Sequence, residues 1–387
     1  MNKHSIAILF TLISTYAIAQ SPITVGAERI PAYIALLKNK NVAIVANPTS
    51  MVGSTHLVDT LLRLGITIKK AFCPEHGFRG TADAGENIGN YKDAKTGLPI
   101  ISLYGKQYKP QPKDLKDVDI VVFDIQDVGV RFYTYISTMH YVMEACAENN
   151  KTLIILDRPN PNGFYVDGPV LDMAYKSFVG MHPIPIVHGC TIGELAQMIN
   201  GEKWLKNKVQ CKLQVITCNN YKHEMYYTLP VKPSPNLASM EAIYLYPSLC
   251  LFEGTPISVG RGTTQAFEIY GHPSFKNYRY QFTPKSIANA SKNPPYENKA
   301  CNGFELKTFA NSFIKSYNKL YLYWLDDAYQ QYAVKDSFFN PFFNKLAGNN
   351  ILQQQVKKGV GEESIRASWE PQLQQYKDMR MKYLLYN

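Results

Sequence analysis

Short apolar runs alternate with amphipathic segments through the first half of the chain. Residues 42–46 are apolar throughout, as in a buried strand, and residues 55–64 carry leucine and valine at helical spacing before Gly65. The same alternation predicts further strands at 66–73, 99–103, 119–124, 152–157 and 184–187, and further helices at 135–149 and 191–200. Strands separated by helices indicate βαβ units, and therefore an α/β fold with a Rossmann-like, mainly parallel sheet covered on both faces.

The second half of the chain has a different pattern. Loops rich in glycine and proline extend from about residue 250 to 300, and an aromatic-rich stretch and a helical pattern near 361–385 follow them. We therefore predict a Rossmann-like domain over residues 20–250 and a smaller C-terminal α/β domain over residues 251–387. No G-x-G-x-x-G or G-x-x-x-x-G-K-S/T sequence follows the first strand, which argues against a dinucleotide or P-loop nucleotide site.

The first nineteen residues have the pattern of a signal peptide. A short basic start precedes a mainly apolar stretch at 6–13, and Ala17-Ile18-Ala19 forms a small-x-small cleavage site that leaves Gln20 as the mature N-terminus. The apolar stretch is too short to span a membrane, and no cysteine follows the cleavage site to carry a lipid. We expect a periplasmic protein without a stable membrane anchor.

Charge and cysteine usage narrow the classes of partner. The net charge is +10, from 41 basic and 31 acidic side chains. The two signs balance over residues 20–200, so the excess lies in residues 201–387, where it is spread as single lysines. This spread is typical of solvated surface and disfavours a nucleic-acid partner. The seven cysteines are odd in number and show no C-x-x-C or zinc-type spacing, so we expect no metal and no cofactor.

Polar side chains follow most of the predicted strands. In an open parallel sheet, ligands bind beyond the carboxyl ends of the strands, so residues at these ends are candidates for a site. Five of the six predicted strands end in such side chains: Asn47 after the first, Glu75, His76, Arg79 and Glu86 after the second, Asp124, Gln126, Asp127, Arg131 and Tyr133 after the fourth, Asp157, Arg158 and Asn160 after the fifth, and His188 after the last.

Glu75 is the strongest candidate for proton transfer among these residues. It comes directly after an apolar strand, where partial burial raises the pKa of a carboxyl group toward the range of a general acid. The other side chains also have structural explanations.

Asp124 can pair with Arg131 or Arg158, and Asp157 can form an internal ion pair with Arg158. His76 and His188 can be core histidines, and Asn160 can be a turn former.

Two loops of the second half have the residues of a binding site. Asn236 lies in a polar, proline-fixed loop, and the glycine-rich stretch 254–268 carries Arg261, Thr263, Thr264 and Glu268. Hydroxyl and amide groups suit a polyhydroxylated ligand, and a fixed guanidinium suits an anionic group on it. An ordinary structural loop is the alternative for the glycine-rich stretch.

Five motifs together resemble one known family. They are residues 47–50 (NPTS), 74–80 (PEHGFRG), 123–135 (FDIQDVGVRFYTY), 156–163 (LDRPNPNG) and 260–264 (GRGTT). They resemble the exo-β-N-acetylmuramidases of the NamZ type, over residues 24–386. The resemblance implies an exo-acting glycoside hydrolase that releases terminal β-linked N-acetylmuramic acid from the non-reducing end of peptidoglycan fragments. It also implies a disaccharide or muropeptide substrate in a cleft between the two domains, with Glu75 as the catalytic glutamate of the PEHG motif.

Glycoside hydrolysis needs an acid and a group that stabilises the positive anomeric carbon. Glu75 is the expected acid, with His76 and Asp124 as further catalytic candidates. The second role is open between the substrate's own acetamido oxygen and another carboxylate, namely Asp124, Asp127, Glu86 or Glu268. A guanidinium from Arg79, Arg131 or Arg261 is expected to hold the lactyl carboxylate of muramic acid.

Two other classes of protein fit part of the pattern. A metal-dependent hydrolase can use carboxylate and imidazole ligands, although no motif spacing supports this class; the candidate ligands are Glu75, His76, Asp124, Asp157 and His188. A periplasmic protein that binds muropeptides or sugars without turnover can use the same two-domain cleft.

Overall fold

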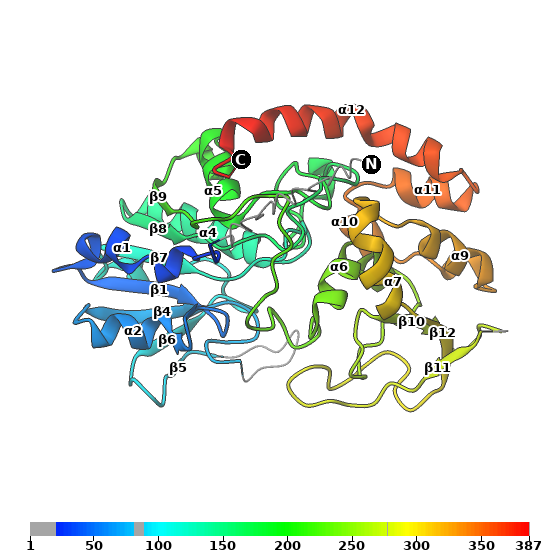
Figure 1. Ribbon diagram of the computed structural model, residues 1–387, viewed down its shortest axis with the longest axis horizontal. Coiled ribbons are helices and arrows are strands. Elements are labelled where there is room, and N and C mark those ends of the chain that lie inside the picture. Colours follow the sequence, from blue (N-terminus) through cyan, green and yellow to red (C-terminus); the bar gives the residue numbers. More distant parts are fainter. Residues whose placement is uncertain (1–20, 81–88, 277, 387) are drawn as a thin grey trace, which may run out of the picture.

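The N-terminal part of the protein is built on a seven-stranded sheet. The computed structural model describes residues 21–80, 89–276 and 278–386. The strand order is β5-β6-β4-β1-β7-β8-β9, and every neighbouring pair is parallel except β5 and β6 (Figure 1). The strands are β1 (Val42–Ala46), β4 (Ile68–Cys73), β5 (Tyr91–Lys92), β6 (Pro99–Ser102), β7 (Ile120–Asp124), β8 (Thr152–Leu156) and β9 (Lys212–Ile216). Apart from β5, the order is that of a Rossmann fold, which confirms the predicted fold class.

Helices cover both faces of the sheet. Successive residues of β1 alternate between two cores, with Ala43 and Val45 in one and Val42 and Ile44 in the other, because side chains of a strand point to opposite faces in turn. One face packs on α1 (Ile30–Leu37) and α2 (Leu57–Arg63). The other packs on α3 (Pro112–Leu115), α4 (Tyr135–Glu148) and α5 (Ile192–Gly201). At the start of α5, Thr191 and Glu194 form the predicted capping box.

Two predicted elements differ from the structure. The stretch predicted as a helix over 55–64 begins with β3 (Thr55–His56), which pairs with β2 (Met51–Val52) before α2 starts. The predicted strand at 184–187 is wrong, because Val187 makes only isolated bridges, to Val130 and Asp167. The place beside β8 is taken by β9, whose alternating exposed and half-buried residues carry a weaker apolar signal.

The C-terminal part combines a small antiparallel sheet with a group of helices. The sheet has the order β10-β12-β11, with β10 (Ile269–His272), β11 (Tyr280–Phe282) and β12 (Cys301–Glu305). The helices are α6 (Met240–Leu249), α7 (Lys307–Phe309), α8 (Lys315–Tyr317), α9 (Tyr323–Gln331), α10 (Pro341–Ala347), α11 (Ile351–Lys357) and α12 (Glu362–Arg380). This is the second α/β unit that the sequence predicts.

Helix α12 returns the chain to the first domain. It runs along one side of the molecule from α11 toward α5 (Figure 1). Tyr376 on α12 donates a hydrogen bond to the carbonyl oxygen of His188 at 2.7 Å, and Tyr386 near the end of the chain donates to Asp157 Oδ2 at 2.6 Å. One apolar core extends from β1 and α4 through α6 into α12, so the two parts pack as one body.

The predicted signal peptide, residues 1–19, lies outside the described residues. All seven cysteines are buried and unbridged. No helix within the described ranges has the length and apolar character needed to cross a membrane.

Candidate active site

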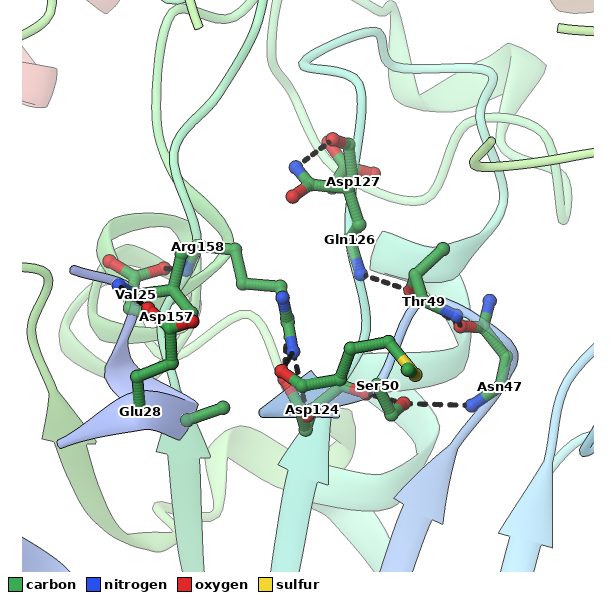
Figure 2. Close-up of polar contacts among 12 residues, drawn as sticks. Val25, Glu28, Asn47, Thr49, Ser50, Asp124, Gln126, Asp127, Asp157 and Arg158 are labelled. Atoms are coloured by element: carbon green, nitrogen blue, oxygen red, sulfur yellow. Dashed lines mark hydrogen bonds and ion pairs between the residues drawn. The ribbon is translucent and has the colours of Figure 1, made fainter. Parts of the chain in front are cut away.

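The carboxyl ends of β1 and β7 are tied together by a buried polar network (Figure 2). Ser50 Oγ accepts from the Asn47 backbone N–H at 3.0 Å and donates to the carbonyl oxygen of Asp124. The Gln126 backbone N–H donates to Thr49 Oγ1 at 2.9 Å. The predicted polar residues do converge at this edge of the sheet, and many of their hydrogen bonds are made to one another.

Asp124 forms a buried ion pair with Arg158, one of the two structural partners considered for it. Arg158 donates from Nε at 2.6 Å and from Nη2 at 2.9 Å to the two carboxylate oxygens, and both side chains are buried. A bidentate pair of this kind fixes two strand ends and leaves neither group facing a ligand. The geometry therefore gives Asp124 and Arg158 a structural place beneath the site.

Asp157 is a second buried carboxylate with a full set of partners. It accepts from the Gly193 N–H at 2.8 Å, from Thr191 Oγ1 at 2.7 Å and from the Tyr386 hydroxyl at 2.6 Å. Burial raises the pKa of Asp157 to about 6, although these hydrogen bonds oppose the shift. Asp157 thus anchors α5 and the C-terminal residues. It also accepts from the Arg158 backbone N–H at 3.0 Å, but the Arg158 guanidinium pairs with Asp124 instead.

A pocket of about 320 Å³ lies between the two parts of the molecule. The first domain contributes Glu75 and His76 after β4, Tyr104 after β6, and residues 132–135, 178 and 179. The loop before α6 contributes Ser234, Asn236 and Leu237, and the C-terminal part contributes Tyr246, Glu253, Arg261, Phe267 and Phe342. The predicted residues Glu75, His76, Tyr133, Asn236 and Arg261 therefore meet in one cavity, whose volume is in the range of small-molecule sites.

Glu75 is presented to this pocket by a tight turn. The Gly77 N–H donates to the Pro74 carbonyl oxygen at 3.2 Å, and His76 in the middle of the turn has a φ of 71°. A left-handed histidine costs on the order of 1 kcal/mol, and strain of this kind collects at functional sites. Glu75 is half-buried, and its carboxylate accepts a hydrogen bond from the Tyr104 hydroxyl.

Arg261 stands on the C-terminal side of the same pocket. Its Nε donates to Glu253 Oε1 at 2.6 Å, and its guanidinium carbon lies 5.1 Å from the centre of the Phe267 ring. Among the described residues, Glu253 is the hydrogen-bond partner of Arg261. A guanidinium held in this way presents a fixed fork to a carboxylate.

Aromatic rings form much of the pocket wall. Tyr246 lies edge-on to Phe267, with ring centres 4.9 Å apart, and Tyr133 lies edge-on to Tyr135 at 4.8 Å. The Tyr133 hydroxyl donates to the Pro233 carbonyl oxygen at 2.7 Å, which fixes the ring against the loop that carries Asn236. Apolar ring surface with few polar groups suits the face of a sugar ring.

Two of the three arginines considered for the lactyl carboxylate lie elsewhere. Arg131 is fully buried and donates to the carbonyl oxygens of Pro169, Ile184 and Leu346 at 2.7 to 2.8 Å. Arg79 pairs with two carboxylates in a separate hollow that Lys95 also lines. Both guanidinium groups are committed to protein partners outside the pocket, so Arg261 is the cation of the three that lines it.

The remaining predicted residues lie outside the pocket lining. His188 Nε2 lies 3.8 Å from Asp127 Oδ2, and both side chains are buried. The Gln126 and Asn160 side chains donate to backbone carbonyl oxygens. Thr263 closes a turn onto Gly260, Thr264 is exposed, and Glu268 accepts from Ser239. Asn47 is buried in the network beneath the pocket, and Glu86 lies outside the described residues.

The proposed ligands of a metal-dependent hydrolase do not assemble. Across the described ranges, no three histidine, cysteine, aspartate or glutamate side chains are grouped so as to hold a metal ion. Two of the five candidates already have protein partners: Asp124 pairs with Arg158, and Asp157 accepts from four hydrogen-bond donors. The geometry gives that class no support.

Sequence reasoning missed several residues of the pocket. Tyr104 follows β6, the one predicted strand whose end was not assigned a polar group, although a phenol hydroxyl is a hydrogen-bond donor. Glu253 stands in an apolar stretch after α6, where only its acidic side chain marks it. Phe178, Tyr246 and Phe267 have ordinary core-like contexts, so no local signal distinguishes them.

Comparison with known proteins places most of the chain in one family. The family models for the N-terminal and C-terminal domains of exo-β-N-acetylmuramidase NamZ match residues 42–241 and 244–386. The two models therefore meet at 241–244, a few residues before the boundary predicted at 250. The chain is 41% identical over 378 residues to peptidoglycan β-N-acetylmuramidase NamZ of Bacillus subtilis strain 168, covering 92% of this chain and 89% of that protein.

Two solved structures share the fold. One crystal structure of a DUF1343 family protein from Bacteroides fragilis NCTC 9343 has a TM-score of 0.89 at 50% identity, covering 95% of this chain and 99% of that one. A second has a TM-score of 0.76 at 29% identity, covering 94% and 99%. The chain belongs to the exo-β-N-acetylmuramidase NamZ family.

Proposed function

We propose that this protein is an exo-acting glycoside hydrolase that releases terminal β-linked N-acetylmuramic acid from the non-reducing end of peptidoglycan fragments. The Bacillus subtilis relative is named as a peptidoglycan β-N-acetylmuramidase. The observation that carries the proposal is the meeting of Glu75 and Arg261 in one pocket with aromatic walls. A proton donor, a cation for a carboxylate and apolar ring surface are the groups that hydrolysis of a muramide requires.

Glu75 supplies the proton in this mechanism. Its carboxyl group protonates the glycosidic oxygen as the bond to the anomeric carbon breaks, and the same carboxylate then takes a proton from the attacking water. The Tyr104 hydroxyl, which donates to this carboxylate, holds it in position. His76 positions Glu75 through the strained turn and shares the pocket lining with it.

The acetamido group of the substrate stabilises the positive anomeric carbon in this mechanism. Among the described residues that line the pocket, Glu253 is the other carboxylate, and Arg261 engages it at 2.6 Å. An acid paired with a guanidinium is a weaker nucleophile, because the cation stabilises its charge. Attack by the acetamido oxygen on the anomeric carbon needs no second protein carboxylate, and other N-acetylhexosaminidases use this route.

Arg261 gives the site its preference for muramic acid. The lactyl ether of muramic acid carries a carboxylate that glucosamine lacks, and the terminal nitrogens of Arg261 can bind it in a bidentate manner. Glu253 orients the guanidinium through Nε and leaves those nitrogens directed to the ligand. Asn236, whose Nδ2 donates to the Ala290 carbonyl oxygen at 2.9 Å, lies in the same lining.

One assay separates this function from the two rival classes. Purified protein incubated with para-nitrophenyl β-N-acetylmuramide releases nitrophenol if it is the proposed hydrolase, and a chelator leaves the rate unchanged. A sugar-binding protein binds the same compound without releasing nitrophenol. Loss of activity on chelation, restored by a metal ion, contradicts the metal-free mechanism.

The protein is further proposed to act outside the cytoplasm. Support comes from the basic start, apolar stretch and Ala17-Ile18-Ala19 site of residues 1–19. Sequencing the N-terminus of protein from the periplasmic fraction should find Gln20 as the first residue. Recovery of protein that begins at Met1 from the cytosol contradicts export by this route.

A further inference from the structure

Three aromatic rings form a cluster beside the Glu75 carboxylate. Tyr104, whose hydroxyl donates to that carboxylate, lies edge-on to Tyr108, with ring centres 6.0 Å apart. The Phe178 ring centre lies 4.4 Å from that of Tyr108 and 6.4 Å from that of Tyr104. Tyr104 and Phe178 line the active-site pocket together with Glu75. We call Tyr104, Tyr108 and Phe178 the aromatic cluster.

The aromatic cluster connects the pocket to the surface of the protein. Tyr104 and Phe178 are half-buried, and Tyr108 is 37% exposed. All three rings belong to the first domain, whereas Arg261 lines the pocket from the C-terminal part. The aromatic cluster and the guanidinium therefore stand on different walls, and the aromatic wall is the one that carries the acid.

Phe178 is held in place through its backbone and by a second ring. The backbone groups of Ser177 and Gly180 bond to each other in both directions, at 2.9 and 3.0 Å, so Phe178 lies in a tight turn. Ser137 Oγ on α4 donates to the Phe178 carbonyl oxygen at 2.7 Å. The Tyr141 ring from the same helix lies nearly parallel to the Phe178 ring, with centres 6.4 Å apart. A side chain fixed in advance loses little freedom when a ligand binds.

The proposed reaction determines which part of the substrate meets these rings. The acid protonates the glycosidic oxygen, and this oxygen departs with the leaving sugar. The leaving sugar therefore lies on the Glu75 side of the pocket, while the muramic acid reaches Arg261 with its lactyl group. In a peptidoglycan strand the leaving sugar is N-acetylglucosamine, which is uncharged. An exo-acting enzyme needs this side open to solvent, because the rest of the glycan extends from it.

We propose that Phe178, supported by Tyr108, is the stacking platform for the leaving N-acetylglucosamine unit. The flat ring packs against the apolar face of the sugar, and the exposed Tyr108 ring extends that surface toward solvent. Because Tyr104 joins the platform to Glu75, a sugar placed on Phe178 presents its glycosidic oxygen to the acid. This inference rests on the proposed function. It adds a preference for a sugar as the leaving group, which Arg261 does not supply.

The test compares two substrates that differ only in the leaving group. One is the disaccharide of N-acetylmuramic acid β-linked to N-acetylglucosamine, and the other is β-N-acetylmuramyl fluoride, which has no leaving sugar. A nitrophenyl muramide is unsuitable here, because its own flat ring can stack on Phe178. The ratio of kcat/KM on the two substrates is measured for the wild-type protein, Phe178→Leu, Phe178→Tyr and Tyr108→Leu. Phe313→Leu, an exposed phenylalanine of the C-terminal domain, is the control.

Leucine keeps apolar volume but removes the ring. Phe178→Leu and Tyr108→Leu should therefore lower kcat/KM on the disaccharide about three- to tenfold and leave the rate on the fluoride unchanged. Phe178→Tyr, which keeps the ring, and the control should retain the wild-type ratio.

Equal losses on both substrates indicate a structural role for the rings and overturn the proposal, as does an unchanged disaccharide rate. If Phe178→Leu does not fold, Tyr108→Leu decides the outcome alone. A wild-type protein that hydrolyses the fluoride but not the disaccharide overturns the platform alone. A wild-type protein that hydrolyses neither contradicts the proposed function, and the platform with it.

Discussion

Arg261 donates from Nε to the Glu253 carboxylate at 2.6 Å, and both side chains line the pocket that contains Glu75. The two acids of this lining therefore have different partners, a guanidinium for Glu253 and a phenol hydroxyl for Glu75. In the proposed mechanism, Glu75 transfers the proton, while Glu253 orients the guanidinium that binds the lactyl carboxylate.

Removing the Arg261 guanidinium should change the preference for muramide over glucosaminide substrates more than the rate of bond cleavage. Arg261→Ala should lower kcat/KM for a β-N-acetylmuramide about ten- to a hundredfold, since a hydrogen bond to a charged group is worth about 1.5 to 3 kcal/mol. The rate on the matching glucosaminide, which lacks the lactyl carboxylate, should change little. Arg279→Ala, an exposed arginine of the same domain, is the control. An unchanged ratio of the two rates contradicts this role for Arg261.

The Tyr104 hydroxyl should contribute to turnover. It donates to the Glu75 carboxylate and holds it in position, so Tyr104→Phe should lower kcat about tenfold through loss of one positioned hydrogen bond. Tyr108→Phe, a neighbour that packs edge-on against Tyr104, should leave kcat unchanged. Equal kcat values for the two variants argue against a direct Tyr104–Glu75 contact.

Participation of the acetamido group has a chemical signature. Replacing the acetyl group of the substrate by a trifluoroacetyl group withdraws electrons from the carbonyl oxygen, which weakens it as a nucleophile. We expect kcat to fall by about tenfold or more, with little change in binding. A rate that does not depend on the acyl group indicates that a protein carboxylate attacks the anomeric carbon instead. Glu253 is then the first candidate.

Asp157 should make the stability of the protein depend on pH. Burial raises its pKa from 3.8 to about 6 in the folded state. The folded protein then binds the proton more tightly than the unfolded chain does, so this residue's contribution is greatest below about pH 4. It is lost as the pH rises toward about 6, by an amount on the order of 3 kcal/mol.

Asp157→Asn provides the check on that stability effect. Asparagine can keep the geometry, because the hydroxyls of Thr191 and Tyr386 can turn from donors into acceptors. The free energy of unfolding in urea should rise in the variant relative to wild type between pH 4 and pH 7. A difference that stays constant over this range contradicts the role assigned to the buried carboxylate.

Much of the fold could be predicted because apolar runs mark buried parallel strands. Residues 42–46 form β1 as predicted, since every residue there is buried between two layers of helices. Residues 184–187 are equally apolar, but they are buried against Val130 and Asp167 without joining the sheet. An apolar run shows that a segment is buried, and the partner that buries it is decided by tertiary packing.

Site residues could be predicted where they directly follow a strand, because the carboxyl ends of parallel strands lie at one edge of the sheet. Glu75 and His76 line the pocket because they follow β4 at its carboxyl end. Asp124 and Arg158 come from the same edge, yet they pair with each other beneath the pocket. The sequence showed that these side chains lie at the edge of the sheet. It did not show which charged groups pair, because pairing depends on distances of a few ångström.

The most direct measurement is the turnover of a β-N-acetylmuramide by Glu75→Gln. The change keeps the size of the side chain and removes its acid, so folding and ligand binding should persist while release of muramic acid falls by about a hundredfold or more. Glu363→Gln, an exposed acid on α12, should behave as wild type. Turnover by Glu75→Gln near the wild-type rate contradicts the assignment of Glu75 as the catalytic acid.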